Sequence, residues 1–282
     1  MEYQQLRQRQ PRFTDEDSPP ASSSPLYDYT RTMYNGLPYG MQNYLLHVYL
    51  STTIGIMFTL FTANFLSTSV NLIYHIGGGV VIITGFVMAV LCVVCFSFIR
   101  PDIMTNEYSI NPPARWIFYI GISIGNGMVI APLIQLVDEI SPEVYFTSFL
   151  ITVIIFGSVS IYTLVVPSKG FLLLGAPLVS GLSTLIWLNI FSGFTALFFG
   201  FNRFNVFVHQ LDVYGGLILF ILYVTYDTYK AIVMFEHHTP DHLGIAVELY
   251  LDFVNIFIRI LSILMEISLK KKSSSDRRER LY

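Results

Sequence analysis

Six polar side chains recur at helical spacing in and just after the apolar segment Leu243–Met265. They are Glu248, Asp252, Asn255, Arg259, Ser262 and Glu266. Their separations of 4, 3, 4, 3 and 4 residues place them on one face of an α-helix, and nearly every residue between them is aliphatic or aromatic. Because charged groups are costly in hydrocarbon, they usually face water or a partner and mark a pathway. We therefore predict a polar stripe, formed by these six residues, on the last apolar helix.

A second acid near an apolar run is Asp227, at the end of the preceding apolar segment. Only a short connection separates the two segments, so we expect their helices to be neighbours and Asp227 and Asp252 to share one site. Two carboxylates close together at low dielectric cannot both ionise easily, and they titrate as a pair. This arrangement predicts a proton-controlled switch formed by Asp227 and Asp252. The alternative is that each acid only hydrogen-bonds a neighbouring helix.

The same pair suggests an ion. Ionised carboxylates are hard oxygen ligands of the kind that Ca²⁺ takes, so Asp227 and Asp252 are candidate metal ligands, with Ca²⁺ as a permeant or bound ion and no other cofactor. Four residues of the polar stripe are predicted to support the site: Glu248, Asn255, Arg259 and Ser262. Arg259 is two turns from Asp252, too far to pair with it on one helix. We expect it to hold Asn255 and Ser262 or to reach a carboxylate on another helix.

Composition sets the class of protein. Of the 282 residues, 53% are hydrophobic and only 12% are charged, whereas a soluble domain carries about 25% charged residues. This balance predicts an all-α integral membrane protein whose first partner is the lipid bilayer, and it excludes a nucleic-acid partner. The polar N-terminus shows no cleavable signal peptide, because the first apolar run begins only near Tyr44.

Seven apolar segments are long enough to cross a bilayer, which takes about 20 helical residues. We place them at 44–66, 74–99, 115–137, 144–166, 171–191, 211–233 and 243–266. The membrane domain is thus expected at 44–268, between a disordered polar N-terminal tail (1–43) and a basic C-terminal tail (269–282). The aromatic-rich stretch 192–210 is a candidate interfacial or re-entrant piece.

Lysine and arginine counts give a conflict on orientation. Four arginines in the N-terminal tail favour a cytosolic N-terminus: Arg7, Arg9, Arg12 and Arg31. The C-terminal tail holds six basic residues, which favour the cytosol as well. Seven full crossings put the two tails on opposite sides of the membrane. Either the polar last segment is re-entrant, or the basic tail lies on the far side.

Two motifs centred on the acids carry a family resemblance. Tyr226-Asp227-Thr228 is followed 25 positions later by Asp252 within the segment 249–260. This combination resembles the transmembrane Bax-inhibitor-motif family. Three further stretches are similar to its Bax inhibitor-1 branch: Val48-Tyr49, Ala131-Pro132-Leu133-Ile134 and the segment Gly175–Ser183. The resemblance covers about residues 44 to 268.

The resemblance implies a seven-helix bundle with the polar-striped last helix central. It also implies a pH-sensitive Ca²⁺ leak in the endoplasmic reticulum or another endomembrane, with Asp227 and Asp252 as the proton-sensing gate. A role in restraining cell death, with cell-death regulatory membrane proteins as candidate partners, follows from the same likeness. Some bacterial relatives latch the acid pair with an Arg in the second helix, but no Arg or Lys occurs between Tyr74 and Phe98. The latch is then expected elsewhere, with Arg259 as the candidate.

Two other functions compete with a leak. A Tyr-Asp in one helix and an Asp in the next is also the layout of intramembrane aspartyl proteases of the presenilin kind, whose acids share a proton and activate water. Those proteases need Gly-x-Gly-Asp around the second acid, whereas this chain has Leu249-Tyr250-Leu251-Asp252. The leucines would block the approach of a substrate backbone, so we expect no enzymatic activity. A non-conducting scaffold that regulates cell-death proteins is the other alternative, and it leaves the polar stripe unexplained.

Overall fold

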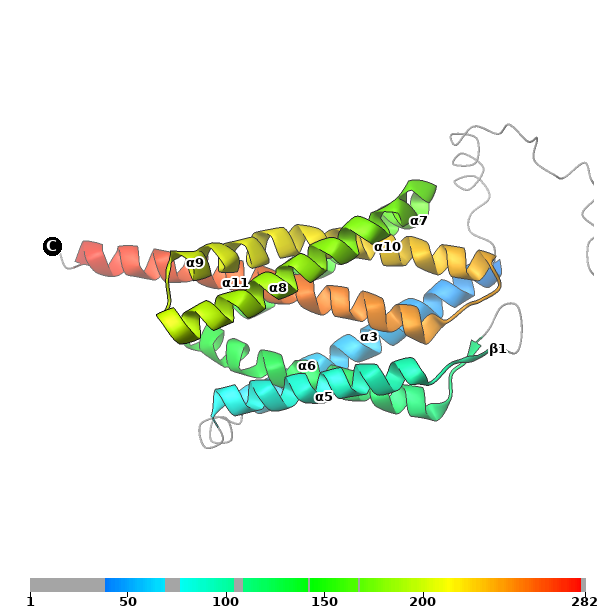
Figure 1. Cartoon of the computed structure of the whole chain (residues 1–282), viewed down its shortest axis with the longest axis horizontal. Coiled ribbons are helices and arrows are strands. Elements are labelled where there is room, and N and C mark those ends of the chain that lie inside the picture. The colour runs from blue at the N-terminus through cyan, green and yellow to red at the C-terminus, as the bar shows by residue number, and fades with distance from the viewer. Residues whose placement is uncertain (1–38, 69–76, 104–108, 142, 167, 280–282) are drawn as a thin grey trace, which may run out of the picture. The chain divides into compact units, whose positions relative to one another are not determined.

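The computed structural model describes residues 39–68, 77–103, 109–141, 143–166 and 168–279. In chain order its elements are α3 (Tyr39–Thr68), α5 (Gly78–Phe98), β1 (Asp102–Ile103), β2 (Ser109–Ile110), α6 (Pro113–Ile140), α7 (Glu143–Val165), the 3₁₀-helix η3 (Lys169–Leu174), α8 (Gly175–Phe199), α9 (Arg203–Gln210), the π-helix η4 (Leu211–Gly215), α10 (Gly216–Glu236) and α11 (His242–Glu279). The two strands pair antiparallel, Asp102 opposite Ile110. The fold is therefore helical almost throughout its described part (Figure 1).

Six helices in the described part are long and apolar enough to cross a membrane, judged by length and composition. They are Gly40–Thr68, Gly78–Phe98, Pro113–Ile140, Glu143–Val165, Gly170–Phe199 and Arg203–Glu236. The last helix, α11, is not among them because it carries Glu248, Asp252 and Arg259 within its apolar stretch. An integral membrane protein is thereby confirmed, with six apolar spans and a seventh, polar-striped helix.

Helix α11 buries two different faces. Six side chains on one face belong to the main hydrophobic core, and their spacing of 4, 3, 4, 3 and 4 residues matches that of the polar stripe: Leu243, Val247, Tyr250, Val254, Phe257 and Leu261. This apolar face packs with α3, α6 and α7, while the helix also lies along α10. The polar stripe is offset by five residues from the apolar one, so it points to a different side of the helix. One helix thereby contributes both core and site.

The other helices pack in pairs around this arrangement. Helix α5 packs along α6, α6 along α3, and α8 along α9 and α10 (Figure 1). Helix α11 enters from the short 237–241 connection after α10, so the two helices that carry Asp227 and Asp252 are neighbours. The neighbouring positions follow from the short connection, as the sequence predicts.

Several predicted boundaries are wrong. The stretch 192–210 is no interfacial or re-entrant piece: α8 continues to Phe199, and α9 begins at Arg203 after a turn at Gly200, whose φ is +74°. Asn202 ends that turn, and its side chain accepts hydrogen bonds from the backbone N–H groups of Phe204 and Asn205. A capping box therefore starts the helix that leads into α10.

The two ends of the predicted membrane domain also differ. Helix α3 begins at Tyr39, and the predicted disordered tail otherwise lies outside the described residues. Helix α11 runs without interruption to Glu279, through residues predicted as a separate basic tail. Helix α11 thus has no internal break, and the start of α3 and the end of α11 lie at opposite ends of the helices (Figure 1).

Glycines on α6 permit the close helix contacts that lipid-embedded bundles use. A Cβ atom on Gly125 would lie 2.7 Å from the carbonyl oxygen of Gly85, and one on Gly127 would lie 2.7 Å from the carbonyl oxygen of Thr59. Both are too short for a real contact, so α6 meets α5 and α3 backbone to backbone at these two positions.

We expect Gly127→Ala to destabilise the protein, because α3 and α6 must move apart to admit the methyl group. The expected loss is about 1–3 kcal/mol, as for other overpacked sites, and it is measured as a lower midpoint of thermal unfolding in detergent. Gly157→Ala on α7 is the matched control, since a Cβ there meets nothing within 4 Å. An unchanged midpoint for Gly127→Ala would contradict the close contact.

Candidate functional site

The polar stripe of α11 lines a cavity of about 640 Å³ that it shares with α8 and α10. Seven polar residues line it: Asn189, Asp212, Asp227, Glu248, Asp252, Asn255 and Arg259. The two aspartates proposed as the gate are deeply buried, with 5% of Asp227 and 4% of Asp252 exposed. Four acids and one cation from three consecutive elements, η4, α10 and α11, thus converge on one space.

Asp227 of α10 and Asp252 of α11 line this cavity together. The Oδ2 atom of Asp252 is buried without a hydrogen-bond partner. Neither acid forms a salt bridge with any residue in the described ranges. A buried carboxylate with no cation is strongly unfavourable, so this geometry calls for a proton or a cation between the two acids.

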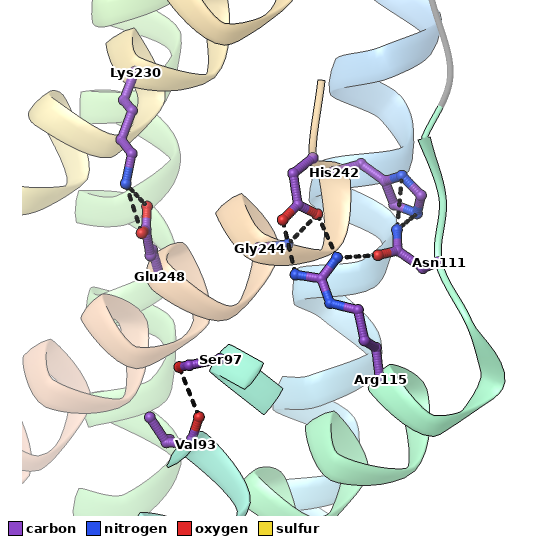
Figure 2. Close-up of polar contacts among 9 residues, drawn as sticks. Val93, Ser97, Asn111, Arg115, Lys230, His242, Gly244 and Glu248 are labelled. Atoms are coloured by element: carbon purple, nitrogen blue, oxygen red, sulfur yellow. Dashed lines mark hydrogen bonds and ion pairs between the residues drawn. The ribbon is translucent and has the colours of Figure 1, made fainter. Parts of the chain in front are cut away.

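Lys230 and Glu248 form an ion pair at one end of the cavity. The Nζ atom of Lys230 donates to both carboxylate oxygens of Glu248, at 2.6 and 2.7 Å (Figure 2). Both groups also act electrostatically on Asp227, one turn from Lys230 on α10. Lys230 is therefore paired with Glu248 and forms no salt bridge with Asp227.

Arg259 forms the second ion pair of the cavity, with Asp212 on η4. Its Nη2 atom donates to Asp212 Oδ1 at 3.1 Å, and its Nε atom donates to the Asp212 carbonyl oxygen at 3.0 Å. Its Nη1 atom donates to the Asn255 side-chain oxygen at 3.0 Å. The guanidinium also lies over the Phe220 ring, 4.6 Å from its centroid. In this conformation Arg259 is held away from the acid pair and does not serve as its latch.

Local backbone features make room for these side chains. A Cβ atom on Gly216 would lie 2.2 Å from Arg259 Nε, so only glycine there admits the guanidinium. The π-helix η4 ends at the preceding residue and brings Asp212 to the same side. At the other helix, a Cβ on Gly175 would lie 3.0 Å from the Tyr226 ring, so the start of α8 packs against the motif that holds Asp227.

Two members of the polar stripe do not take part in the cavity. The Ser262 hydroxyl donates to the carbonyl oxygen of Ile258 on its own helix, at 2.8 Å. Glu266 lies beyond the cavity and pairs with His209, Nε2 to Oε1 3.3 Å. Of the two alternatives predicted for Arg259, contact with a carboxylate on another helix is confirmed, by Asp212. Arg259 also contacts Asn255 but not Ser262.

A separate polar cluster anchors the start of α11. Arg115 of α6 is 3% exposed, and its guanidinium donates to both carboxylate oxygens of Asp241 at 2.9 and 2.8 Å. Asp241 Oδ1 also accepts from the Gly244 backbone N–H at 2.9 Å, as an N-cap does. Asn111 contacts both Arg115 and His242 (Figure 2). This cluster fixes the residue at which α11 begins and hence the position of the polar stripe along the axis of the helix.

No group of three or more His, Cys, Asp or Glu side chains in the described ranges is arranged to hold a metal ion. The candidate Ca²⁺ ligands are therefore two carboxylates, Asp227 and Asp252, where a resident Ca²⁺ takes 6–8 oxygens. This donor set fits an ion that passes or binds briefly with most of its water, and does not fit a tightly held structural ion.

Sequence reasoning missed the partners of the charged stripe. Asp212, Lys230 and the Arg115–Asp241 pair have no place in the predicted site. One signal was available: a buried Arg within an apolar helix requires a counter-charge, and Asp212 is an acid at the start of the neighbouring apolar segment.

The comparison with known families decides what kind of protein carries this site. A family model described as "Inhibitor of apoptosis-promoting Bax1" matches residues 41–268, which include every residue of the cavity. The chain belongs to the Bax inhibitor family. The resemblance read from the two aspartate motifs is thereby confirmed.

Individual relatives agree with the family. The chain is similar to Bax inhibitor 1 of Arabidopsis thaliana, 27% identical over 260 residues, 91% of this chain and 94% of that protein. Bax inhibitor 1 of Oryza sativa subsp. japonica is 31% identical over 59% of this chain and 64% of its own length. The human Bax inhibitor 1 is 28% identical over 57% of this chain and 62% of its own length. No solved structure matches the chain.

Proposed function

We propose that this Bax inhibitor family protein is a pH-sensitive Ca²⁺ leak channel of an intracellular membrane, gated by a proton shared between Asp227 and Asp252. One observation carries the proposal: the two buried acids line the same cavity of about 640 Å³ and have no salt-bridge partner in the described ranges. The bundle is organised around α11, which supplies one gate acid, and a role in restraining cell death accords with the name of its relatives.

The two ion pairs of the cavity explain why the acid pair is the titrating element. Lys230 forms an ion pair with Glu248, and Arg259 forms one with Asp212. Neither cation therefore forms a salt bridge with Asp227 or Asp252. Asp227 and Asp252 can then share one proton, which leaves the pair with a single negative charge, or be neutralised by an arriving divalent cation. Proton and Ca²⁺ compete for the same two carboxylates, which couples permeability to pH.

Ca²⁺ is proposed as the permeant ion, without a resident metal or other cofactor. The pair offers hard oxygen ligands but no complete coordination shell, so binding is weak enough to let the ion leave. Conduction needs a site of this kind, since an ion that is held by six or more protein oxygens stays bound.

The proposal assigns no enzymatic activity to the acid pair. Leu251 precedes Asp252 and lines the cavity with it, so a bulky side chain stands beside the acid where a protease needs backbone access. Incubating the purified protein with a transmembrane peptide tests this. Cleavage that disappears in Asp252→Asn would favour an intramembrane protease instead.

The test of the leak uses purified protein in liposomes loaded with a Ca²⁺ indicator, across pH 5 to 8. We expect Ca²⁺ entry above that of protein-free liposomes, with a rate that changes with pH. Sealed vesicles are verified by adding a Ca²⁺ ionophore at the end. If the native protein passes no Ca²⁺ at any pH, the leak fails, and a non-conducting scaffold would account for the family name.

We further propose that the protein lies in the endoplasmic reticulum or another endomembrane with its N-terminus in the cytosol. In this proposal the continuous helix α11 crosses the membrane in addition to the six apolar spans, which makes an odd number of crossings between the two ends of the chain. Epitope tags at the two termini should therefore differ in antibody access after the plasma membrane alone is permeabilised, the N-terminal tag being accessible. Equal access of both tags would contradict this topology.

A further inference from the structure

An apolar groove of about 500 Å³ lies on the opposite side of α11 from the acidic cavity. Its walls are α3 and α7, and the Phe253 ring of α11 forms its floor. Phe253 makes edge-to-face contacts with Phe149 and Phe156 of α7, with ring centroids 6.1 and 5.5 Å apart. We call this space the α3–α7 groove. Its volume falls in the range of about 300–1,000 Å³ that ligand sites occupy.

The surroundings of the groove define the class of its occupant. Both walls belong to helices that are apolar enough to cross a membrane, and no charged side chain lines the groove. Along α7 it reaches from Phe149 to Leu164, about 22 Å at 1.5 Å per residue. One leaflet of hydrocarbon is about 15 Å thick. An acyl chain fits this length and this uncharged lining, whereas an extended peptide would leave backbone groups unpaired.

One buried hydroxyl in the groove lacks the partner that its neighbours have. Ser148, Thr152 and Thr163 of α7 each donate to a carbonyl oxygen four residues earlier, at 2.7 to 2.9 Å. Ser160 is 3% exposed, and its hydroxyl makes no such bond. It lines the groove together with Tyr49. The Ser160 proton is thus not donated to a carbonyl oxygen of its own helix, unlike the protons of the other three hydroxyls.

We propose that the α3–α7 groove binds one acyl chain of a bilayer phospholipid, whose ester carbonyl accepts a hydrogen bond from Ser160. The chain fills the space between α3 and α7 and packs on Phe253. No charged headgroup is recognised, because the lining offers no charge.

The bound acyl chain would contact residues adjacent to Asp227 and Asp252 on the side away from the acidic cavity. Phe253 follows Asp252 on α11, and the Tyr49 hydroxyl of the groove lies 3.4 Å from Thr228 Oγ1, next to Asp227 on α10. Filling the groove therefore restrains the residues adjoining both acids. This consequence, unlike the binding itself, rests on the proposed leak function.

The test is photolabelling in liposomes of phosphatidylcholine that carries a diazirine on one acyl chain, followed by mass spectrometry of the labelled peptides. Gly157→Leu places a side chain in the groove, where a Cβ meets nothing within 4 Å and the fold is undisturbed. Gly193→Leu on α8 is the matched control, since its Cβ also meets nothing within 4 Å. We expect labelling of residues 149–164 in the native protein and in Gly193→Leu, and a several-fold loss in Gly157→Leu.

Three outcomes would overturn the proposal. Labelling of the groove no stronger than that of other lipid-facing helix surfaces would mean ordinary bilayer contact, and labelling that persists in Gly157→Leu would place the chain elsewhere. Displacement of the acyl probe by a photoreactive sterol would assign the groove to a sterol. Labelling is read without any flux, so its failure is separate from failure of the leak. If the leak exists, loss of its pH response in Gly157→Leu but not in Gly193→Leu supports the coupling.

Discussion

Replacing both Asp227 and Asp252 by asparagine is expected to abolish the pH dependence of Ca²⁺ flux. Asparagine has the shape of a neutral aspartic acid, so the double variant should hold the flux of the native protein at low pH at every pH between 5 and 8. Each single substitution removes the like-charged neighbour with which the other acid shares its proton. We expect the several-fold pH response to fall to less than about twofold in either one. The measurement is indicator-detected Ca²⁺ entry into liposomes.

Asp138→Asn is the matched control for these variants. Asp138 is an exposed acid at the end of α6, outside the cavity. Its substitution should leave both the size and the midpoint of the pH response unchanged. A double variant whose flux still follows pH like the native protein would show that the gate lies elsewhere. A response lost in Asp138→Asn as well would indicate a general effect of removing acids.

The ion pair of Arg259 and Asp212 should set the pH at which the gate responds. Arg259 is seven residues from Asp252 on one helix, about 10 Å away. At that distance a unit charge acts on the acids with about 1.7 kcal/mol at an effective dielectric constant of 20, roughly one pH unit. Removing the cation makes protonation of the acid pair more favourable. Arg259→Leu should therefore move the midpoint of the flux response to higher pH by roughly one unit.

Substitution of Asp212 should shift the midpoint of the flux response in the opposite direction, and Arg259→Lys serves as the control. Asp212→Asn removes a negative charge from the same cavity and should move the midpoint to lower pH, and the double variant should return close to the native midpoint. Arg259→Lys keeps the charge but loses the paired hydrogen bonds, so its midpoint should stay near the native value. Equal shifts in Arg259→Lys and Arg259→Leu would show that packing, and not charge, is responsible.

The main features of the site could be predicted from residue type and spacing. A helical repeat of polar residues inside an apolar run has few explanations in a membrane, and the short connection 237–241 makes two acid-bearing helices neighbours. The structure places Asp227 and Asp252 in one cavity. The burial of the apolar face of α11 follows from the same 3.6-residue periodicity.

Partner choice and helix ends could not be predicted in the same way. Whether Arg259 contacts Asp252, Ser262 or Asp212 depends on the rotation of α10 about its axis and on the π-helix η4. No local sequence pattern predicts either of these features. The aromatic residues of the stretch 192–210 are compatible with a segment at the membrane interface and with the ends of two membrane-spanning helices. The structure shows where the helices end, with a capping box at Asn202 that starts α9. Likewise, no local sequence pattern indicates that Arg115 is buried against Asp241.

Infrared difference spectroscopy of the protein in liposomes, titrated between pH 5 and 8, tests the shared proton most directly. The account predicts a protonated-carboxyl band that appears with the same midpoint as the change in Ca²⁺ flux and that is missing in the Asp227→Asn/Asp252→Asn double variant. Asp138→Asn should retain the band. A band that survives in the double variant, or a native protein whose flux changes with pH while no carboxyl band does, would contradict a gate made of these two acids.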